Sequence, residues 1–243
     1  MMLHRAISLI LGLIILTGCM YPSDNLSKNQ LTNDAQLQTV QIAIDQYVEA
    51  NGGILPIYTK ESNTPLYQKY VIDFSLLKNQ NLIQDIPGTA FENGGHYQYI
   101  LTDVERQPTV KVIDLRIADE IRSLQQRLNI YRNENTYPPF GEQIADQIYS
   151  LDYEALNLEA PPHISSPYSD SKLPVYIDTN GKLLIDYRID LYRELQNKEH
   201  NYRKGDDIRP ILTEDFPVVP AYSIPFTVED NEPIFAPNIE EGW

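Results

Sequence analysis

Ile113-Asp114-Leu115-Arg116-Ile117 returns almost unchanged later in the chain as Ile185-Asp186-Tyr187-Arg188-Ile189. Before each copy the sequence alternates or runs apolar around a polar turn, which is typical of a β-hairpin. After each copy apolar residues recur at helical spacing. The chain therefore leaves a hairpin and enters a helix twice in the same way, and this shared exit predicts a repeated α+β unit.

Each predicted hairpin has two short strands. In the first hairpin, Tyr97 to Thr102 and Thr109 to Ile113 flank a turn. In the second, Val175-Tyr176-Ile177 and Leu183-Leu184-Ile185 flank Asp178-Thr179-Asn180-Gly181-Lys182. The Asn-Gly pair is a strong hairpin-turn signal. The same segment also resembles part of a calcium loop, but its glycine comes one residue too early and no bidentate Glu follows, so a turn explains it better.

A longer helix is predicted before each hairpin. Leu37 to Ala50 carries apolar residues at helical spacing and ends at Asn51-Gly52-Gly53, a strong helix stop. Ile117 to Arg132 has the same spacing and ends near Asn135, shortly before two prolines. Tyr47-x-x-x-Asn51 and Tyr131-x-x-x-Asn135 align at these two ends, so the helices are expected to finish alike.

Two further patterns complete the expected repeat. Ile72-Asp73-Phe74-Ser75-Leu76-Leu77 matches Leu151-Asp152-Tyr153-Glu154-Ala155-Leu156 in its apolar and acidic positions, which predicts a short helix in each unit. A third amphipathic helix, with Leu191 and Leu195 on its apolar side, should follow the second exit.

The chain beyond Asp206 differs from the repeats because it is rich in proline, which excludes long helices and central strands. An extended segment draped over the repeats is therefore expected, and its final residues are acidic. These prolines are Pro210, Pro217, Pro220, Pro225, Pro233 and Pro237, and the terminal acids are Glu229, Asp230, Glu232, Glu240 and Glu241.

Together these patterns predict an α+β fold made of two similar units of helix, loop and antiparallel hairpin. The predicted divisions are a signal peptide over residues 1–18, a lipidated cysteine and flexible tether over 19–35, repeat one over 36–114, repeat two over 115–186, and a helix with an extended acidic tail over 187–243.

The unit resembles the globular heads of type IV pilins and pseudopilins, in which a helix ending in Tyr-x-x-x-Asn-Gly and a proline leads to a small antiparallel sheet. Tyr47, Asn51, Gly52 and Pro56 fit that pattern, as do Tyr97-Gln98-Tyr99 and Pro167-Tyr168-Ser169. The prepilin cleavage motif and the long assembly helix are absent. The resemblance therefore implies a shared small α+β architecture and no filament function.

The N-terminus has the parts of a secretory signal. Arg5 supplies a positive region, and Ala6 to Leu16 is an apolar run too short for a spanning helix, which needs roughly twenty residues. Leu16-Thr17-Gly18-Cys19 resembles the lipobox of bacterial lipoproteins. The resemblance implies cleavage after Gly18 and a mature chain that begins at Cys19, carrying S-diacylglycerol and an N-acyl chain. An ordinary signal peptide with a chance cysteine near its cleavage site is the alternative.

The cysteine at position 19 is the only one in the chain, so its lipidation would leave none for disulfides, a thiolate metal site or a thiol nucleophile. Loss of residues 1–18 would remove one basic residue and no acidic one, taking the formal charge from −15 to −16. Such a charge argues against nucleic acid, whose phosphates need clustered Lys and Arg. The polar stretch from Tyr21 to Asp34 is typical of a solvated tether.

Catalytic motifs are missing. His96, His163 and His200 show no helical zinc spacing, and the chain has neither a Gly-x-Ser-x-Gly elbow nor a phosphate loop. No catalytic, cofactor-binding or metal-binding residue is predicted, no cofactor is expected, and the protein is predicted not to be an enzyme. A pair of carboxylates of the glycosidase kind stays open, because such pairs meet in space and not in sequence.

Seventeen tyrosines are present, and aromatic faces can bind sugars or peptides. Tyr131, Tyr149 and Tyr153 occupy apolar positions and are interpreted as packing residues.

The expected protein is a lipoprotein on the extracytoplasmic face of the cell membrane that acts as a binding or scaffold module. Its partners would be the membrane, through the lipid anchor, and an envelope protein or cell-wall ligand, with no nucleic acid. The alternatives are a lipoprotein that captures glycans or peptides and a cell-wall hydrolase that uses paired carboxylates.

Overall fold

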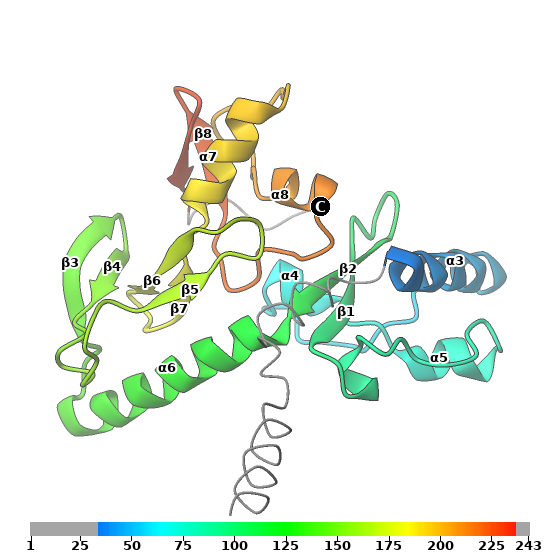
Figure 1. Cartoon of the computed structure of the whole chain (residues 1–243), viewed down its shortest axis with the longest axis horizontal. Helices are drawn as coiled ribbons and strands as arrows, with labels where there is room; N and C mark the ends of the chain where they lie inside the picture. Colours follow the sequence, from blue (N-terminus) through cyan, green and yellow to red (C-terminus); the bar gives the residue numbers. More distant parts are fainter. Residues whose placement is uncertain (1–33, 237–243) are drawn as a thin grey trace, which may run out of the picture. The chain divides into compact units, whose positions relative to one another are not determined.

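The computed structural model describes residues 34–236, in which helices alternate with small antiparallel sheets (Figure 1). The expected α+β class is therefore confirmed. The helices are α3 (Asp34–Ala50), α4 (Leu66–Lys69), α5 (Phe74–Asn79), the 3₁₀ turn η1 (Phe91–Asn93), α6 (Leu115–Asn135), α7 (Arg188–Asn197) and α8 (Pro210–Asp215). The strands are β1 (Tyr97–Thr102), β2 (Thr109–Asp114), β3 (Phe140–Ala145), β4 (Ile148–Leu151), β5 (His163–Ser165), β6 (Lys172–Asp178), β7 (Leu183–Ile185), β8 (Phe226–Glu229) and β9 (Glu232–Phe235).

The first part of the fold is α3 packed on the β1–β2 hairpin. One apolar face of α3 is buried against that hairpin and α5, and Gln41 joins the helix to the hairpin by accepting from the Val110 N–H at 2.8 Å and donating to the Pro108 carbonyl at 2.9 Å. The predicted helix and both predicted strands are confirmed here. The buried residues of this first core are Val40, Ala43, Ile44, Tyr47, Ile72, Phe74, Leu77, Ile83, Ala90, Tyr97, Tyr99, Leu101, Val110, Val112 and Val218.

The two long helices end as their shared sequence predicts. The Asn51 side-chain amide donates to the Tyr47 carbonyl at 2.7 Å, and the Asn135 amide donates to the Tyr131 carbonyl at 3.0 Å. Each asparagine thus satisfies a carbonyl that the last helical turn leaves free. The chain then turns through a left-handed residue in both places, Gly52 at φ 64° and Thr136 at φ 64°.

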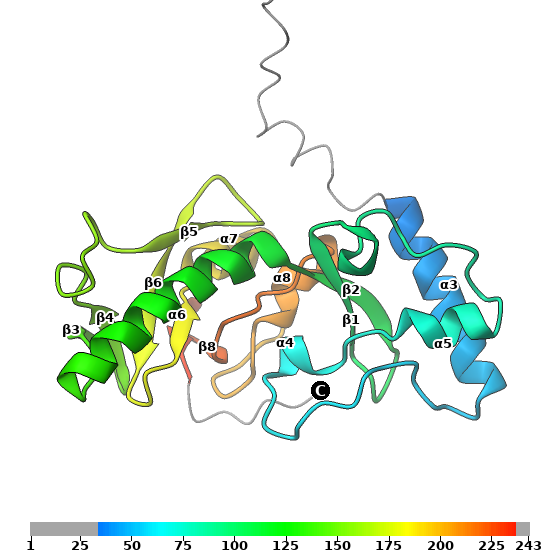
Figure 2. The same ribbon diagram turned by 90° about the horizontal axis from the view of Figure 1, so that it is seen from below.

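The second part pairs α6 with a five-stranded antiparallel sheet in the order β3-β4-β6-β5, with β7 also paired to β6. Figure 2 shows α6 running alongside β5, and α3 alongside β2. The predicted helix and hairpin are present, and the Asp178 carboxylate accepts from the Asn180 and Lys182 N–H groups, so this segment is a turn as expected.

The short helix predicted over Leu151–Leu156 is wrong. Leu151 ends strand β4, and the residues after it form turns in which Asp152 accepts from the Ala155 N–H at 3.0 Å. In the first unit, Asp73 instead caps the true helix α5 by accepting from the Ser75 N–H at 2.9 Å. An acidic residue that binds its own backbone stabilises either a helix start or a turn, and the hairpin β3–β4, which the first unit lacks, decides between them here.

The proline-rich end is less extended than expected. It holds helix α8 and the hairpin β8–β9, both of which pack on α7, and the predicted side of α7 with Leu191 and Leu195 is buried. Its residues complete the second core, whose buried members are Ile117, Ile121, Leu124, Leu128, Leu151, Leu156, Ile164, Tyr168, Leu173, Val175, Ile177, Leu183, Ile185, Tyr187, Leu191, Leu195, Ile208, Ile211, Leu212, Phe226 and Val228.

A short segment of this end joins the two cores. Val112 donates its N–H to the Pro217 carbonyl and its carbonyl accepts from the Val219 N–H, both at 2.9 Å, so the segment forms an isolated parallel bridge with β2. From the other side the buried Tyr168 and Tyr187 hydroxyls donate to the Val218 and Ala221 carbonyls, both at 3.1 Å. Residues 34–236 accordingly belong to one compact unit.

The repeated sequence after each hairpin forms an Asp-x-Arg clamp, in which an aspartate binds the arginine two residues later. The structure contains a third copy besides the two that the sequence repeat covers. Asp114, Asp186 and Asp207 each accept from the N–H of the arginine two residues on. Each arginine turns back so that its Nε and Nη2 bind the same carboxylate, with Nη2 contacts of 2.6, 2.7 and 2.7 Å for Arg116, Arg188 and Arg209. The third copy was missed because it follows an irregular segment and not a hairpin, although Asp207-Ile208-Arg209 repeats the spacing.

No helix in the described part of the chain, from residue 34 to 236, is both long and apolar enough to span a bilayer.

Candidate functional site

The residues predicted for lipid attachment and signal cleavage, Cys19 and Gly18, lie outside the described residues. The three later histidines lie apart from one another. His96 is exposed just before β1, His163 is exposed on β5, and His200 lies after α7, where its Nε2 is 3.1 Å from the Asn231 Oδ1. Within residues 34–236 no three His, Cys, Asp or Glu side chains come close enough to hold a metal ion.

Many tyrosines are structural. Burial raises the pKa of Tyr168 and Tyr187 well above its ordinary value, so both hydroxyls stay protonated and donate to the carbonyls described above. Tyr131 and Tyr149 pack against the second core. Tyr153 is half-buried and lines a hollow in the surface, so it has a free side that packing does not use.

This hollow, called the β4–β6 hollow below, has a volume of about 410 Å³. Its floor is apolar, with two tyrosine rings, and three carboxylates stand at its margin. None of its lining residues is basic. The lining residues are Gly141, Glu142, Ser150, Leu151, Asp152, Tyr153, Glu154, Pro161, Pro162, Pro174, Val175 and Tyr176.

The pairing of β3 with β4 forms one wall of the hollow. A β-carbon on Gly141 would lie 2.4 Å from the Ser150 Oγ, so a larger residue at this position would displace that hydroxyl. The Ser150 hydroxyl uses that space to accept from the Glu142 N–H at 2.8 Å. The Asp152 N–H donates to the Pro139 carbonyl at 2.9 Å, which holds the adjoining turn.

Tyr176 on β6 also lines the hollow, and its ring contacts a neighbouring aromatic side chain. Its ring meets the Phe235 ring edge-on at 6.2 Å, and the Arg188 guanidinium lies 4.3 Å from the Phe235 centroid. Burial, together with the charge of Asp186, raises the pKa of Tyr176 although Arg188 opposes this. The ring is therefore fixed by the second Asp-x-Arg clamp and stays neutral.

The wall formed by β3 and β4 ends at β3, which has a strand paired on one side only. β3 is the terminal strand of its sheet, and its residues from Phe140 to Gln143 are exposed. Its pairing with β4 shifts register twice, which twists the edge and disfavours indiscriminate strand addition. An extended ligand crossing the hollow would pass beside this edge.

A second hollow lies on the other side of Pro161 and Pro162, with a volume of about 410 Å³ between α6 and the segment before β5. Glu120 and Glu159 both line it, and burial raises the pKa of Glu120 while the charge of His163 opposes the shift.

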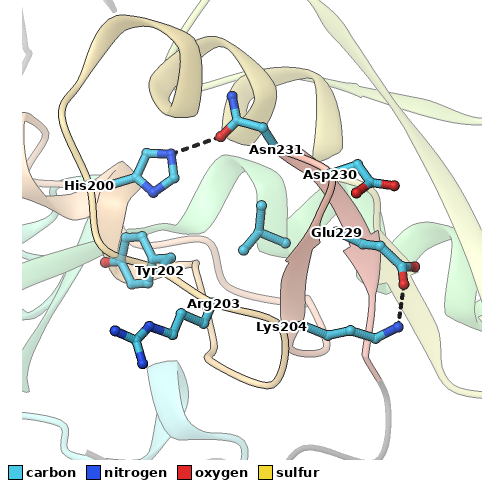
Figure 3. A pocket seen from close by; sticks show the side chains of 8 residues that line it. His200, Tyr202, Arg203, Lys204, Glu229, Asp230 and Asn231 are labelled. Carbon is cyan, nitrogen blue, oxygen red and sulfur yellow. Dashed lines mark hydrogen bonds and ion pairs between the residues drawn. The ribbon is translucent and has the colours of Figure 1, made fainter.

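A third hollow of about 350 Å³ lies between the loop after α7 and the β8–β9 turn (Figure 3). Burial and the nearby Glu214 and Asp207 raise the pKa of Tyr202 at its wall to about 12. Lys204 forms an ion pair with Glu229 at its rim, as Figure 3 shows. This hollow is lined by charges of both signs, whereas the charged residues that line the β4–β6 hollow are all acidic.

Comparison with known proteins found a match for one part of the chain. Residues 33–114 match the family model described as the YphF family N-terminal domain, and the match ends at Asp114, the last residue of β2. No curated protein matches the chain. No solved structure matches it either, so the likeness to pilin heads rests on the sequence motifs alone.

Proposed function

We propose that the protein is a lipid-anchored module on the extracytoplasmic face of the cell membrane, and that its β4–β6 hollow binds a basic peptide segment of an envelope protein. The observation that carries the binding role is the lining of that hollow, with three carboxylates and no basic group around an apolar floor with two tyrosines. The observation behind the anchor is the sequence Leu16-Thr17-Gly18-Cys19 after an apolar run.

How firmly the protein is held at the membrane depends on the number of acyl chains that Cys19 carries. Each buried methylene contributes about 0.8 kcal/mol, and one chain holds a protein only marginally, so diacylglycerol on Cys19 would give stable attachment. The polar residues after it would then act as the tether that separates the folded part from the bilayer.

A peptide suits the β4–β6 hollow better than a glycan. An uncharged sugar could stack on Tyr153 and Tyr176 but would gain nothing from Glu142, Asp152 and Glu154. A basic segment gains from all of them, and the open edge of β3 offers backbone groups to an extended chain. A partner with Lys or Arg beside an apolar residue therefore fits both the floor and the margin.

The three carboxylates are exposed, so each should contribute about 0.5 kcal/mol to binding of a basic ligand. Neutralising all three should lower affinity by about tenfold, because about 1.4 kcal/mol corresponds to a factor of ten. The loss should be largest at low salt, since screening weakens exposed pairs.

The test measures fluorescence anisotropy of labelled basic, neutral and acidic peptides with the full chain in lipid nanodiscs. The variant carries Glu142→Gln, Asp152→Asn and Glu154→Gln, which keep size and hydrogen-bond acceptors. The matched control carries Glu49→Gln, Glu105→Gln and Glu199→Gln, which are exposed and remove the same charge elsewhere. The proposal expects binding of basic peptides to fall only in the first variant. Equal losses in both, or binding of labelled glycans without basic peptides, would refute it.

The anchor has its own test. Cys19→Ala should abolish incorporation of labelled fatty acid and leave an uncleaved precursor, whereas Thr17→Ala should keep both reactions because a small residue stays at that position. Continued labelling of the Cys19→Ala chain would contradict lipidation without touching the binding proposal.

A further inference from the structure

A separate hollow of about 530 Å³ lies against α6, on residues that the proposed peptide site does not use. It is called the α6 pocket below. Its lining comes from the segment before and within α4, from α6, from the start of β7 and from the loop at Tyr222. The lining residues are Asn63, Pro65, Gln68, Ala118, Ile121, Arg122, Gln125, Lys182, Leu183 and Tyr222.

The charge of the α6 pocket is opposite to that of the chain. Acidic residues outnumber basic ones 34 to 19 in the sequence, yet the lining holds Arg122 and Lys182 and no acid. Arg122 pairs with Asp119 at 2.6 Å, but both side chains are 67% exposed, so this pair is weak and yields readily to a ligand. Within residues 34–236 the Lys182 side chain has no ion pair at 4.0 Å or less.

The rest of the lining combines apolar surface with uncharged hydrogen-bonding groups. Pro65, Ala118, Ile121 and Leu183 supply the apolar part. Three side-chain amides and the Tyr222 hydroxyl supply the polar part. An apolar wall with a few convergent polar groups is the usual composition of a small-molecule site.

Tyr222 has a strained backbone that its neighbours hold in place. Its φ is 59°, in the left-handed region that a bulky residue seldom occupies. The Ile185 N–H donates to the Tyr222 carbonyl at 2.8 Å, and the Ser223 hydroxyl donates to the Pro220 carbonyl at 2.6 Å. Such strain persists only where surrounding contacts over-determine it, and it is concentrated at ligand sites.

The buried Arg209 ties two walls of the pocket together. Its Nη1 donates to the Ser223 Oγ at 3.2 Å, next to Tyr222, and its guanidinium lies 5.1 Å from the centroid of the Tyr67 ring, next to Gln68. Arg209 therefore contacts the residue next to Tyr222 and the residue next to Gln68.

We propose that the α6 pocket binds a small organic acid with an apolar body, whose acid group lies between Arg122 and Lys182 and accepts a hydrogen bond from Tyr222. The apolar body would lie on Ile121 and Leu183. The acid is taken to be soluble and not part of a phospholipid, because the volume suits a small free molecule and the acidic chain is repelled by an anionic lipid surface.

The test is isothermal titration of the full chain in phosphatidylcholine nanodiscs, with empty nanodiscs as the blank. The probes are 4-phenylbutyrate, its neutral analogue 4-phenylbutanamide and the cation 4-phenylbutylamine. The proposal expects the acid to bind at one site, the amide to bind about fivefold more weakly, and the amine to bind more weakly still because its charge is repelled.

Two double variants distinguish binding in the α6 pocket from a general effect of the protein's charge. Arg122→Gln with Lys182→Gln should weaken binding of the acid about fivefold. Because both side chains are exposed, the fold should be retained, which a circular dichroism spectrum verifies. Arg106→Gln with Lys60→Gln is the matched control, since Arg106 is exposed and also pairs with an aspartate three residues away. Absence of acid binding, equal binding of the amide, equal losses in both variants, or displacement of the acid only by anionic phospholipid would overturn the proposal.

Discussion

Replacement of Arg209 by methionine should destabilise the fold more than the same change in the two equivalent clamps. All three arginines bind their aspartate through Nε and Nη2, so the local geometry is shared. Their environments differ, because the arginine side chain is 39% exposed in Arg116, 34% in Arg188 and 1% in Arg209. The three variants therefore make the same chemical change at arginine side chains that differ in burial.

The magnitudes follow from that burial. Removing one partner of a buried ion pair costs about 3–5 kcal/mol, because the other charge is left without a partner. Arg209→Met should fall in this range, since Asp207 is only 15% exposed and Ser223 also loses a donor. Asp114 and Asp186 are only 7% and 8% exposed, so Arg116→Met and Arg188→Met also leave a buried carboxylate without its partner. Because solvent reaches these partly exposed arginine positions, each change should cost about 1.5–3 kcal/mol, the range for hydrogen bonds to charged groups.

The measurement is urea unfolding followed by far-ultraviolet circular dichroism. Adding Asp207→Asn to Arg209→Met should recover part of the loss, because it removes the stranded charge. The reasoning is refuted if the three single variants cost the same, or if the double variant is less stable than Arg209→Met.

Two further changes probe other close contacts. Gly95→Ala should cost at least about 2–3 kcal/mol, because its β-carbon would lie 2.1 Å from the Thr89 carbonyl carbon and the backbone must shift. Gly94→Ala is the control: it has open space but a φ of 83°, and it should cost about 1 kcal/mol. Thermal unfolding measures both variants, and equal losses of stability would count against the clash at Gly95. Burial raises the pKa of Asp190 above 3.8, although hydrogen bonds from Ser169 and Ser166 oppose the shift. The folded chain therefore keeps this proton to higher pH than the unfolded chain does. Its stability falls as pH rises through the raised pKa. Asp190→Asn has nothing to titrate there, so the stability of the variant minus that of the natural chain should be more positive at pH 7 than at pH 4 in urea unfolding; the same difference at both values would show that the shift is absent.

The sequence by itself determined the local elements of this protein. Helical spacing predicted α3, α6 and α7, and the strand patterns predicted both main hairpins, because these depend on neighbours a few residues away. The Tyr-x-x-x-Asn ends behaved as a local rule should, since Asn51 and Asn135 bind carbonyls of their own helices. The prediction for Cys19 is also local, and it stays a prediction.

Only the tertiary structure decided the rest. Leu151–Leu156 carries the same pattern as Ile72–Leu77 but ends a strand, because β4 pairs with β3 and β6. The proline-rich end fills the core and joins its two parts, which no period in that segment predicts. Both proposed sites gather residues from distant segments, such as Glu142 with Tyr176 and Gln68 with Tyr222. Side-chain patterns encode which face of an element is buried, whereas a hollow depends on how several elements pack, and that information lies in no single stretch of the chain.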